Sequence, residues 1–351
     1  MKKIEMVKSD DWHCHVRDNE MLNTVLHFTQ ERFDRAIIMP NLLPPVTSIP
    51  LAKAYKKRII SALAKESNFT PLMTIYLTDK TNPQEIEKGF KEGVWVAAKL
   101  YPAGATTNSD AGVTDIKRIY QVFKKMQKIG MPLLVHGEQL IHNGNKVDIF
   151  DREIIFINQT LTPLLVEFPE LKVVLEHITT KEASSFVWSM YKQHGNIAAT
   201  ITPHHLCINR NDIFEGGIRP DLYCLPIAKR EVNRIALRKA ATSGKKCFFL
   251  GTDSAPHFQH RKYDACGCAG IFNAPVGIEL YASVFEEEGM LSTFESFASI
   301  NGPKFYGLPV NKRKMTLIRE PWTVPNEIVC SNSDILTPFM AGEKIPWKIA
   351  K

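Results

Sequence analysis

The sequence lacks the features that mark a secreted or membrane-spanning protein. No apolar run approaches the roughly twenty residues needed to cross a bilayer, and Met1-Lys2-Lys3 is followed by Glu5 and Lys8 rather than by an apolar signal core. The seven cysteines are odd in number and irregularly spaced, so they do not suggest a disulfide framework. We therefore expect a soluble protein of the reducing cytoplasm, with no membrane partner.

The sequence also lacks a concentrated basic charge. Its 44 Lys and Arg residues exceed its 37 Asp and Glu residues, but they are scattered, and no long basic run carries interleaved aromatic residues. We therefore expect no nucleic-acid partner. The formal net charge of +7 is compatible with an anionic small-molecule substrate.

Internal repeats and low-complexity segments are absent too, and the composition is that of an ordinary globular protein. Of the 351 residues, 44% are hydrophobic, which is enough for a large core. Barrels and large α/β folds of this length often form a single unit. We therefore expect one domain over residues 1–351, with the proline-rich C-terminal tail wrapped around it.

Short apolar runs alternate with amphipathic segments almost from end to end. Leu51, Tyr55 and Ile59, at four-residue spacing, are typical of a helix. The runs are apolar on both sides, as in a buried parallel sheet, and we count eight: 9–15, 35–39, 72–77, 96–100, 132–136, 172–177, 197–201 and 247–251. Eight β/α units predict an α/β protein with a closed (β/α)8 TIM-type barrel, and an open doubly wound sheet is the competing architecture.

Polar residues fall at or just past the ends of these runs. They are His13, His15, Asn41, Lys99, His136, His177, Thr202 and Asp253. In a barrel these ends meet at one rim, where such enzymes keep their active sites, whereas an open sheet would place them along a line. No Gly-x-Gly-x-x-Gly follows the first run, so a dinucleotide-binding open sheet has no support. We therefore favour the barrel.

A His-x-His pair gives the first chemical signal. Residues two apart in a strand point to the same side, so His13 and His15 can bind one ion. His136, His177 and Asp253 stand at equivalent places on three other strands. Four histidines and one aspartate that converge on one rim predict a metal site.

Lys99 ends an apolar strand beside the proposed cations. An isolated lysine at such a place usually extends its amine to solvent, and a bare ammonium here would be both desolvated and repelled. The alternative is a neutral amine that has reacted with carbon dioxide to give a carbamate, an anion able to bridge two metals. Charge counting favours the carbamate, because two divalent cations facing a carbamate, Asp253 and a hydroxide keep a net positive charge for an anionic substrate.

These residues match a known family. The metal-site residues lie in segments such as Asp11-Trp12-His13-Cys14-His15, Glu176-His177-Ile178-Thr179-Thr180 and Gly251-Thr252-Asp253-Ser254-Ala255-Pro256-His257, which resemble the dihydroorotases of the short bacterial type, class II, in the amidohydrolase superfamily. The resemblance extends over nearly the whole chain and is weakest over residues 139–146 and 313–327.

The resemblance implies a zinc enzyme of pyrimidine (UMP) biosynthesis, a homodimer that reversibly interconverts dihydroorotate and N-carbamoyl-L-aspartate. It implies two Zn²⁺ ions per subunit, one held by His13, His15, Lys99 and Asp253 and the other by Lys99, His136 and His177. Carbamylated Lys99 (N6-carboxylysine) and a hydroxide would bridge the ions. Asp253 would act as general base and then as general acid toward the leaving nitrogen.

Substrate recognition also follows from the resemblance. Arg17, Asn41 and His257 match positions that hold the substrate carboxylate, and Arg17, two residues beyond His15, would lie on the same face of an extended segment. The other expected substrate contacts are His15, His136, the backbone at Leu225 and Ala269, and a mobile loop over residues 102–112 that carries Thr106 and Thr107.

Two other interpretations stay open. A hydantoinase or dihydropyrimidinase would share the barrel and metals, and Arg17 discriminates because it is useful only for a substrate with a carboxylate. A catalytically silent relative that serves as a structural partner would usually lack metal ligands, and none is missing here. His204-His205, Cys266 and Cys268 are not expected to bind metal.

Overall fold

The computed structural model describes residues 2–331 and 333–350. An eight-stranded parallel sheet lies at its centre, in the order β11-β10-β9-β6-β5-β4-β3-β2. Its strands are β2 (Asp10–Cys14), β3 (Arg35–Ile38), β4 (Thr70–Tyr76), β5 (Ala97–Leu100), β6 (Leu133–Val135), β9 (Val173–Leu175), β10 (Ile197–Ile201) and β11 (Phe248–Leu250). Each strand overlaps one of the eight apolar runs, so the predicted strands are confirmed.

The sheet closes on itself just beyond β2 and β11. The backbone N–H of Asp253 donates a hydrogen bond of 2.8 Å to the carbonyl of His13, and the N–H of His15 donates one of 2.9 Å to the carbonyl of Ser254. These bonds join the two ends of the sheet and complete the (β/α)8 barrel. The barrel is confirmed, and the competing open sheet is wrong.

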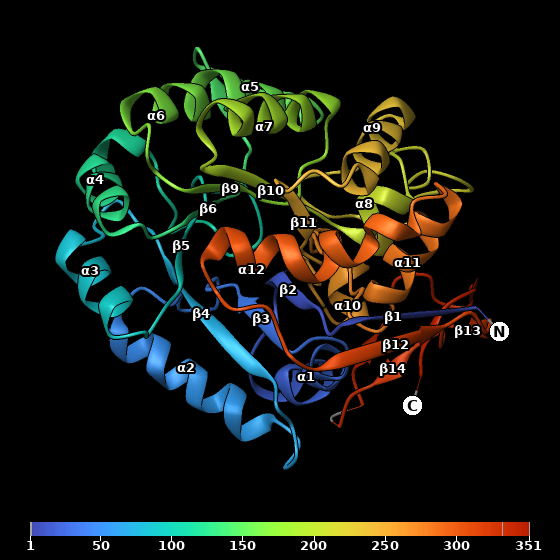
Figure 1. Cartoon of the computed structure of the whole chain (residues 1–351). Coiled ribbons are helices and arrows are strands. Elements are labelled where there is room, and N and C mark those ends of the chain that lie inside the picture. Colours follow the sequence, from blue (N-terminus) through green and yellow to red (C-terminus); the bar gives the residue numbers. More distant parts are fainter. Residues whose placement is uncertain (1, 332, 351) are drawn as a thin grey trace.

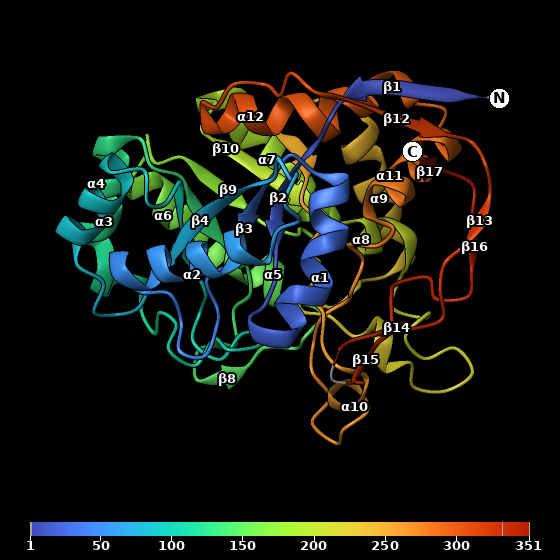
Figure 2. The ribbon, with the colours of Figure 1, turned by 90° about the horizontal axis from the view of Figure 1, so that it is seen from below.

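Helices cover the outside of the barrel (Figure 1). They are α1 (Asn19–Arg32), α2 (Ile49–Ala62), α3 (Pro83–Lys91), α4 (Tyr120–Ile129), α5 (Arg152–Phe156), α6 (Thr162–Glu167), α7 (Lys181–His194), α8 (Pro203–Cys207), α9 (Glu231–Thr242) and α11 (Gly277–Glu287). The short helix α10 (Gln259–Lys262) lies instead at one end of the barrel (Figure 2). Local sequence explains several of their ends. The Asn82 and Thr180 side chains accept hydrogen bonds from the first turns of α3 and α7, and α7 ends at Gly195, which adopts the left-handed conformation that glycine tolerates.

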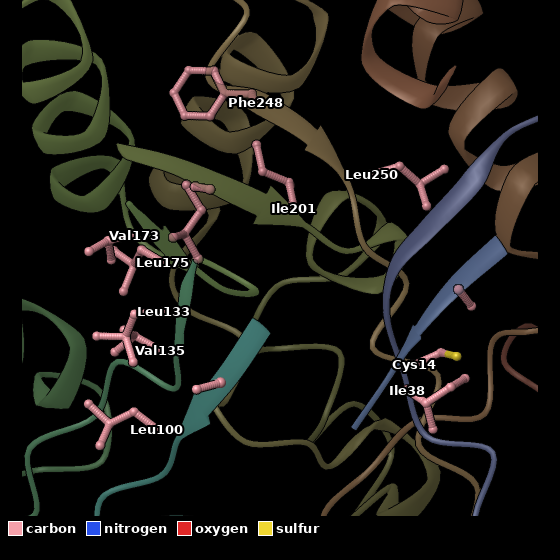
Figure 3. Close-up of a cluster of buried hydrophobic side chains, with 14 of the residues drawn as sticks. Cys14, Ile38, Leu100, Leu133, Val135, Val173, Leu175, Ile201, Phe248 and Leu250 are labelled. Atoms are coloured by element: carbon pink, nitrogen blue, oxygen red, sulfur yellow. The ribbon is translucent and has the colours of Figure 1, made fainter. Parts of the chain in front are cut away.

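Alternate residues of the barrel strands belong to two different cores. Figure 3 shows Leu133 and Val135 of β6, and Val173 and Leu175 of β9, on the side of the sheet that faces the helices. The residues between them belong to a separate cluster inside the barrel, which contains Trp12, Ile37, Met39, Ala97, Leu134, Val174, Ala198 and Phe249. This alternation decides which side chains can reach the interior.

The two ends of the barrel differ. Helix α12 (Asn301–Tyr306) covers the end where the strands begin, and Tyr306 stacks on Trp12 with their ring centres 4.5 Å apart. In Figure 2, α12 lies at one end, while α10 and the strand β8 (Asn145–Lys146), paired with β7 (Ile141–His142), lie at the other. The end where the strands finish is therefore left to loops, and this is the end at which barrel enzymes carry their active sites.

The two terminal segments pair with each other beside the barrel. Strands β1 (Lys3–Val7), β12 (Lys314–Ile318) and β17 (Lys348–Ile349) form an antiparallel sheet. Two further antiparallel pairs follow, β13 (Trp322–Thr323) with β16 (Lys344–Ile345), and β14 (Ile328–Val329) with β15 (Ile335–Leu336). Leu317 and Trp347 are buried in the main core. One domain over residues 1–351 stays a prediction, which these contacts support. Among the described residues, every helix is too short or too polar to span a bilayer.

Candidate metal centre and substrate pocket

The predicted site residues come together at the loop-covered end of the barrel. All of them except Lys99 and His257 line one cavity of about 20 Å³. Those two residues contact its lining, because the Lys99 Nζ lies 4.8 Å from the centre of the Tyr101 ring and the His257 Nε2 lies 3.0 Å from the Arg17 Nη2. Side chains from strands far apart in the sequence therefore form one site.

Three ligand atoms form a nearly equilateral triangle. The Nε2 atoms of His13 and His15 are 3.4 Å apart, and each lies 3.2 Å from the Oδ1 of Asp253. Tetrahedral zinc with bonds of about 2.0–2.1 Å places its ligand atoms about 3.3 Å apart. The triangle therefore fits one zinc ion without rearrangement.

A buried carboxylate holds the two strands of this triangle together. Asp11 accepts hydrogen bonds from the backbone N–H of His13 (3.1 Å), the N–H of Thr252 (2.8 Å) and the hydroxyl of Thr252 (2.6 Å). Burial raises the pKa of Asp11 to about 6, and these three donors oppose that rise. Asp11 thus fixes the backbone on both sides of the His13–Asp253 pair.

Lys99 is fully buried, and its amine has a polar partner. Its Nζ contacts the carboxylate of Glu176, whose Oε1 also lies 3.0 Å from the Nδ1 of His13. Burial lowers the pKa of Lys99 well below its ordinary range, which favours the neutral amine that reacts with carbon dioxide. Sequence reasoning missed Glu176, although strand alternation places it on the inward side, two residues after Val174.

His136 and His177 complete the cluster. Their ring centres are 4.9 Å apart, and that of His177 is 5.0 Å from that of His13. The Nε2 of His136 lies 2.7 Å from the Oε2 of Glu138, a second missed carboxylate, which leaves Nδ1 for a metal. The Nδ1 of His177 has no hydrogen-bond partner within the described part of the chain. Burial lowers the pKa of both imidazoles, so they are neutral, the form that binds a metal.

Three site residues have an unusual backbone conformation. Arg17, His177 and Asp253 have φ angles of 57°, 41° and 46°, in the left-handed region that residues other than glycine rarely adopt. Such strain concentrates at functional sites. The expectation that Arg17 continues an extended segment is wrong, because the chain turns there and the Arg17 Nε donates to the carbonyl of Pro256 over 2.9 Å.

The expected carboxylate pocket is connected to the loop above it. His257, beside Arg17, also has its Nε2 3.0 Å from the carbonyl of Ala269, which accepts a hydrogen bond of 3.2 Å from the Thr107 hydroxyl. The Asn41 side-chain amide donates to the carbonyl of Thr107 over 3.0 Å. Burial, helped by the Arg17 charge, lowers the pKa of His257 to about 2, so its ring is neutral. The loop is thus folded over the site.

A second group of possible ligands lies beside this cavity. Ligand atoms of His204, His205 and Cys224 all lie within 4.8 Å of one another. However, both ring nitrogens of His205 are engaged, Nδ1 by the Thr202 hydroxyl at 2.8 Å and Nε2 by the Pro226 carbonyl at 2.9 Å. Burial raises the pKa of the Cys224 thiol to about 12. This group therefore fits a metal poorly compared with the first cluster.

Comparison with known proteins identifies the family. The amidohydrolase family pattern matches residues 10–313. A dihydroorotase of Erwinia tasmaniensis is 57% identical to this chain over 351 residues, which cover 99% of this chain and 98% of that protein. The chain belongs to the dihydroorotase family of amidohydrolases. It is an enzyme, a hydrolase of cyclic amide C–N bonds with a role in pyrimidine synthesis, and the resemblance seen in the sequence is confirmed.

Solved structures of the family have the same fold. A crystal structure of the dihydroorotase of Saccharomyces cerevisiae in complex with 5-fluoroorotic acid superposes with a TM-score of 0.93 at 34% identity, covering 100% of this chain and 99% of that one. The dihydroorotase of Campylobacter jejuni gives a TM-score of 0.89 at 37% identity, covering 99% and 98%. Amidohydrolases are typically metal-dependent, and this amidohydrolase has the buried ligand groups for it.

Proposed function

We propose that this amidohydrolase interconverts dihydroorotate and N-carbamoyl-L-aspartate with two Zn²⁺ ions per subunit. The observation that carries the proposal is that one small cavity joins a zinc-sized triangle of ligand atoms to an arginine–histidine pair. A substrate that presents a cyclic amide to the first and a carboxylate to the second is a carboxylated dihydropyrimidine.

The ligand groups divide into two sets that share Lys99. His13, His15 and Asp253 would hold one ion, His136 and His177 the other, and the Lys99 carbamate would touch both. To form the carbamate, the neutral Lys99 amine bonds through its Nζ to the carbon of CO₂ and releases one proton to solvent, so a neutral group becomes an anion. The carbamate nitrogen keeps one N–H, which can still donate to Glu176. When bound, the ions supply polarisation of the scissile carbonyl and a lowered pKa for water.

Asp253 is the group placed to move a proton. Burial alone would raise its pKa, but the facing histidines, His13 first, hold the pKa of Asp253 well below its ordinary value. It is therefore ionised and can accept a proton as water adds to the carbonyl carbon. When the ring C–N bond breaks, Asp253 returns that proton to the leaving nitrogen, which gives the ureido group. The second proton of the water goes to solvent as the new carboxylic acid ionises to the carboxylate of the product.

Arg17, Asn41 and His257 would hold the substrate carboxylate. A guanidinium can pair a carboxylate bidentately, and the neutral His257 ring and the Asn41 amide can add hydrogen bonds. The backbone at Leu225 and Ala269, and the edges of His15 and His136, would border the ring. The S. cerevisiae relative was solved in complex with 5-fluoroorotic acid, a pyrimidine acid, which supports a carboxylated pyrimidine as the class of ligand.

Thr106 and Thr107 belong to the proposed lid. The cavity beneath them, about 20 Å³, has room for roughly one water molecule. A ring-sized substrate therefore requires this loop to open and close in each turnover.

We also propose that the enzyme is a homodimer of the cytoplasm. The homodimer rests on the sequence resemblance alone. The cytoplasm is supported by the seven cysteines, all of which are free thiols.

The rate of dihydroorotate consumption, followed by its ultraviolet absorbance, tests the proposal. We expect turnover by the purified protein, loss of turnover after chelation, and recovery when Zn²⁺ is returned. A metal-loaded protein that leaves dihydroorotate intact but opens dihydrouracil would instead identify a dihydropyrimidinase. Full activity after complete metal removal would contradict the zinc dependence.

A further inference from the structure

Lys262 is a buried lysine whose three donors are all used by backbone carbonyls. It is the last residue of α10 and only 5% exposed. Its Nζ donates to the carbonyls of Tyr223 (2.9 Å), Cys268 (3.0 Å) and Gly270 (2.7 Å). An ammonium has three N–H donors, so its hydrogen bonding is complete. No carboxylate pairs with it within 4 Å in the described part of the chain.

The three carbonyls belong to the two segments that border the proposed substrate pocket. Cys268 and Gly270 flank Ala269, and Tyr223 lies two residues before Leu225. Successive carbonyls of an extended segment point to opposite sides, and here the Ala269 carbonyl contacts Thr107 and His257 while its neighbours bind Lys262. The Gly270 N–H also donates to the carbonyl of Tyr223 over 2.9 Å, so the segments are joined at this point.

The positive charge of Lys262 lies behind the proposed carboxylate pocket. Burial, helped by the Arg17 charge, lowers the pKa of Lys262 to about 8, and the Lys262 charge in turn helps to lower the pKa of His257. The other titratable groups that act on it are Cys224, Asp221 and Cys268. A buried cation without a carboxylate partner is costly to fold. A bound anionic substrate would supply part of the missing counter-charge.

We infer that Lys262 is a positioning residue for the substrate carboxylate, because it fixes the Leu225 and Ala269 segments and adds positive charge behind Arg17. The inference rests on the proposed function. It concerns binding rather than chemistry, since Lys262 reaches neither the metal ligands nor the cavity. Loss of Lys262 should therefore act on KM far more than on kcat.

The test compares Lys262→Met with a matched control, Lys229→Met. Lys229 is also 5% exposed and donates to a single carbonyl, that of Ile227 at 2.8 Å, but it makes no contact with the Ala269 segment. We expect both variants to lower the melting temperature. Only Lys262→Met should raise KM for dihydroorotate. The rise should be at least about tenfold, which is the size of one lost charge-assisted interaction. The kcat should stay within about threefold, and the zinc content should be unchanged. Lys262→Arg should recover most of the affinity.

The pH profile of the unmodified enzyme gives a measurement that does not depend on a variant that folds. KM for dihydroorotate should rise above about pH 8 as the Lys262 ammonium is lost, and this rise should be absent in Lys262→Met. A flat KM from pH 7 to 9.5, or a variant KM equal to that of Lys229→Met, would show that Lys262 is only structural. If the unmodified enzyme leaves dihydroorotate intact, the proposed function fails, and this inference fails with it.

Discussion

The hydrogen bond from the Asp253 N–H to the His13 carbonyl, 2.8 Å long, joins the last strand of the barrel to the first. The side chains of the same two residues meet on the inner side, where the Asp253 Oδ1 lies 3.2 Å from the His13 Nε2. Closure of the barrel and assembly of the first metal-ligand set are therefore one structural event. A change to the side chain of Asp253 can be made without breaking the bond that closes the barrel.

Asp253→Asn changes the side chain of Asp253 and leaves in place the backbone hydrogen bond that closes the barrel. The amide keeps the size and the backbone bond, but it cannot accept a proton. We expect kcat to fall by more than about 10²-fold, the lower end of what acid–base catalysis contributes, with a nearly unchanged melting temperature. Zinc content measured on the same sample separates loss of the proton acceptor from loss of metal. Turnover within a few-fold of the unmodified enzyme would assign the role to another residue.

Lys99→Ala removes the one side chain proposed to touch both ions. We expect undetectable turnover and fewer than two zinc ions per subunit, measured by elemental analysis. Removal of a fully buried lysine also takes away one of the two contacts of Glu176, so the melting temperature should fall. A variant with a full pair of ions and near-normal turnover would rule out the bridging carbamate.

The barrel and most of the site could be predicted because both follow from alternation along strands. Buried parallel strands are recognisable as short apolar runs, and the polar residue that ends each run must lie at the rim. The same rule could have found Glu176, which shares the inward side of its strand with Val174. It was missed because a glutamate next to a predicted metal histidine looks like part of a motif rather than a ligand-orienting group.

Other features could not be read from the sequence. The left-handed backbone at Arg17, His177 and Asp253 is imposed by tertiary contacts, and none of these residues prefers it. The sheet of β1, β12 and β17 pairs segments more than 300 residues apart along the chain, and β17 has only two residues. A pattern of period two needs a longer run to be visible.

Thr107→Gly tests the lid. This change removes the hydroxyl that donates to Ala269 and makes the loop more flexible. We expect kcat/KM for dihydroorotate to fall between about twofold and tenfold, the equivalent of one neutral hydrogen bond of about 0.5–1.5 kcal/mol. Thr107→Ser, which keeps the hydroxyl, is the control and should stay close to the unmodified enzyme. If Thr107→Gly has the same kcat/KM as the unmodified enzyme, closure of the loop does not contribute to turnover.

Lys262 should also give stability a characteristic pH dependence. Its pKa is lowered to about 8 in the folded enzyme, from an ordinary value of 10.5, so between these values the unfolded chain binds more protons. Stability relative to Lys262→Met should therefore rise from pH 8 to 10.5, by at most about 1.4 kcal/mol per pH unit, and be level below pH 8. Melting temperatures of both proteins at pH 7, 8.5 and 9.5 check this. If the stability of the unmodified enzyme relative to Lys262→Met falls as the pH rises, the pKa of Lys262 is raised by folding rather than lowered.

Arg17 decides between dihydroorotase and the neighbouring cyclic amidases. Its guanidinium is partly buried, turned into the site by a left-handed backbone, and held by Pro256 on one side and His257 on the other. A substrate without a carboxylate leaves this charge desolvated and without a counter-ion, a penalty of roughly 2 to 5 kcal/mol. We therefore expect dihydrouracil to be turned over at least tens of times less efficiently than dihydroorotate.

Arg17→Met should remove that preference. Methionine keeps much of the apolar stem but has no charge, so kcat/KM for dihydroorotate should fall by a factor of at least tens while that for dihydrouracil changes little. The two zinc ions should remain, because Arg17 is not among their proposed ligands, and zinc content is therefore the control. The measurement is kcat/KM for both substrates with both proteins. If the variant still prefers dihydroorotate, or if the unmodified enzyme accepts both substrates equally, the carboxylate is bound elsewhere, and the hydantoinase-like alternative explains the pocket better.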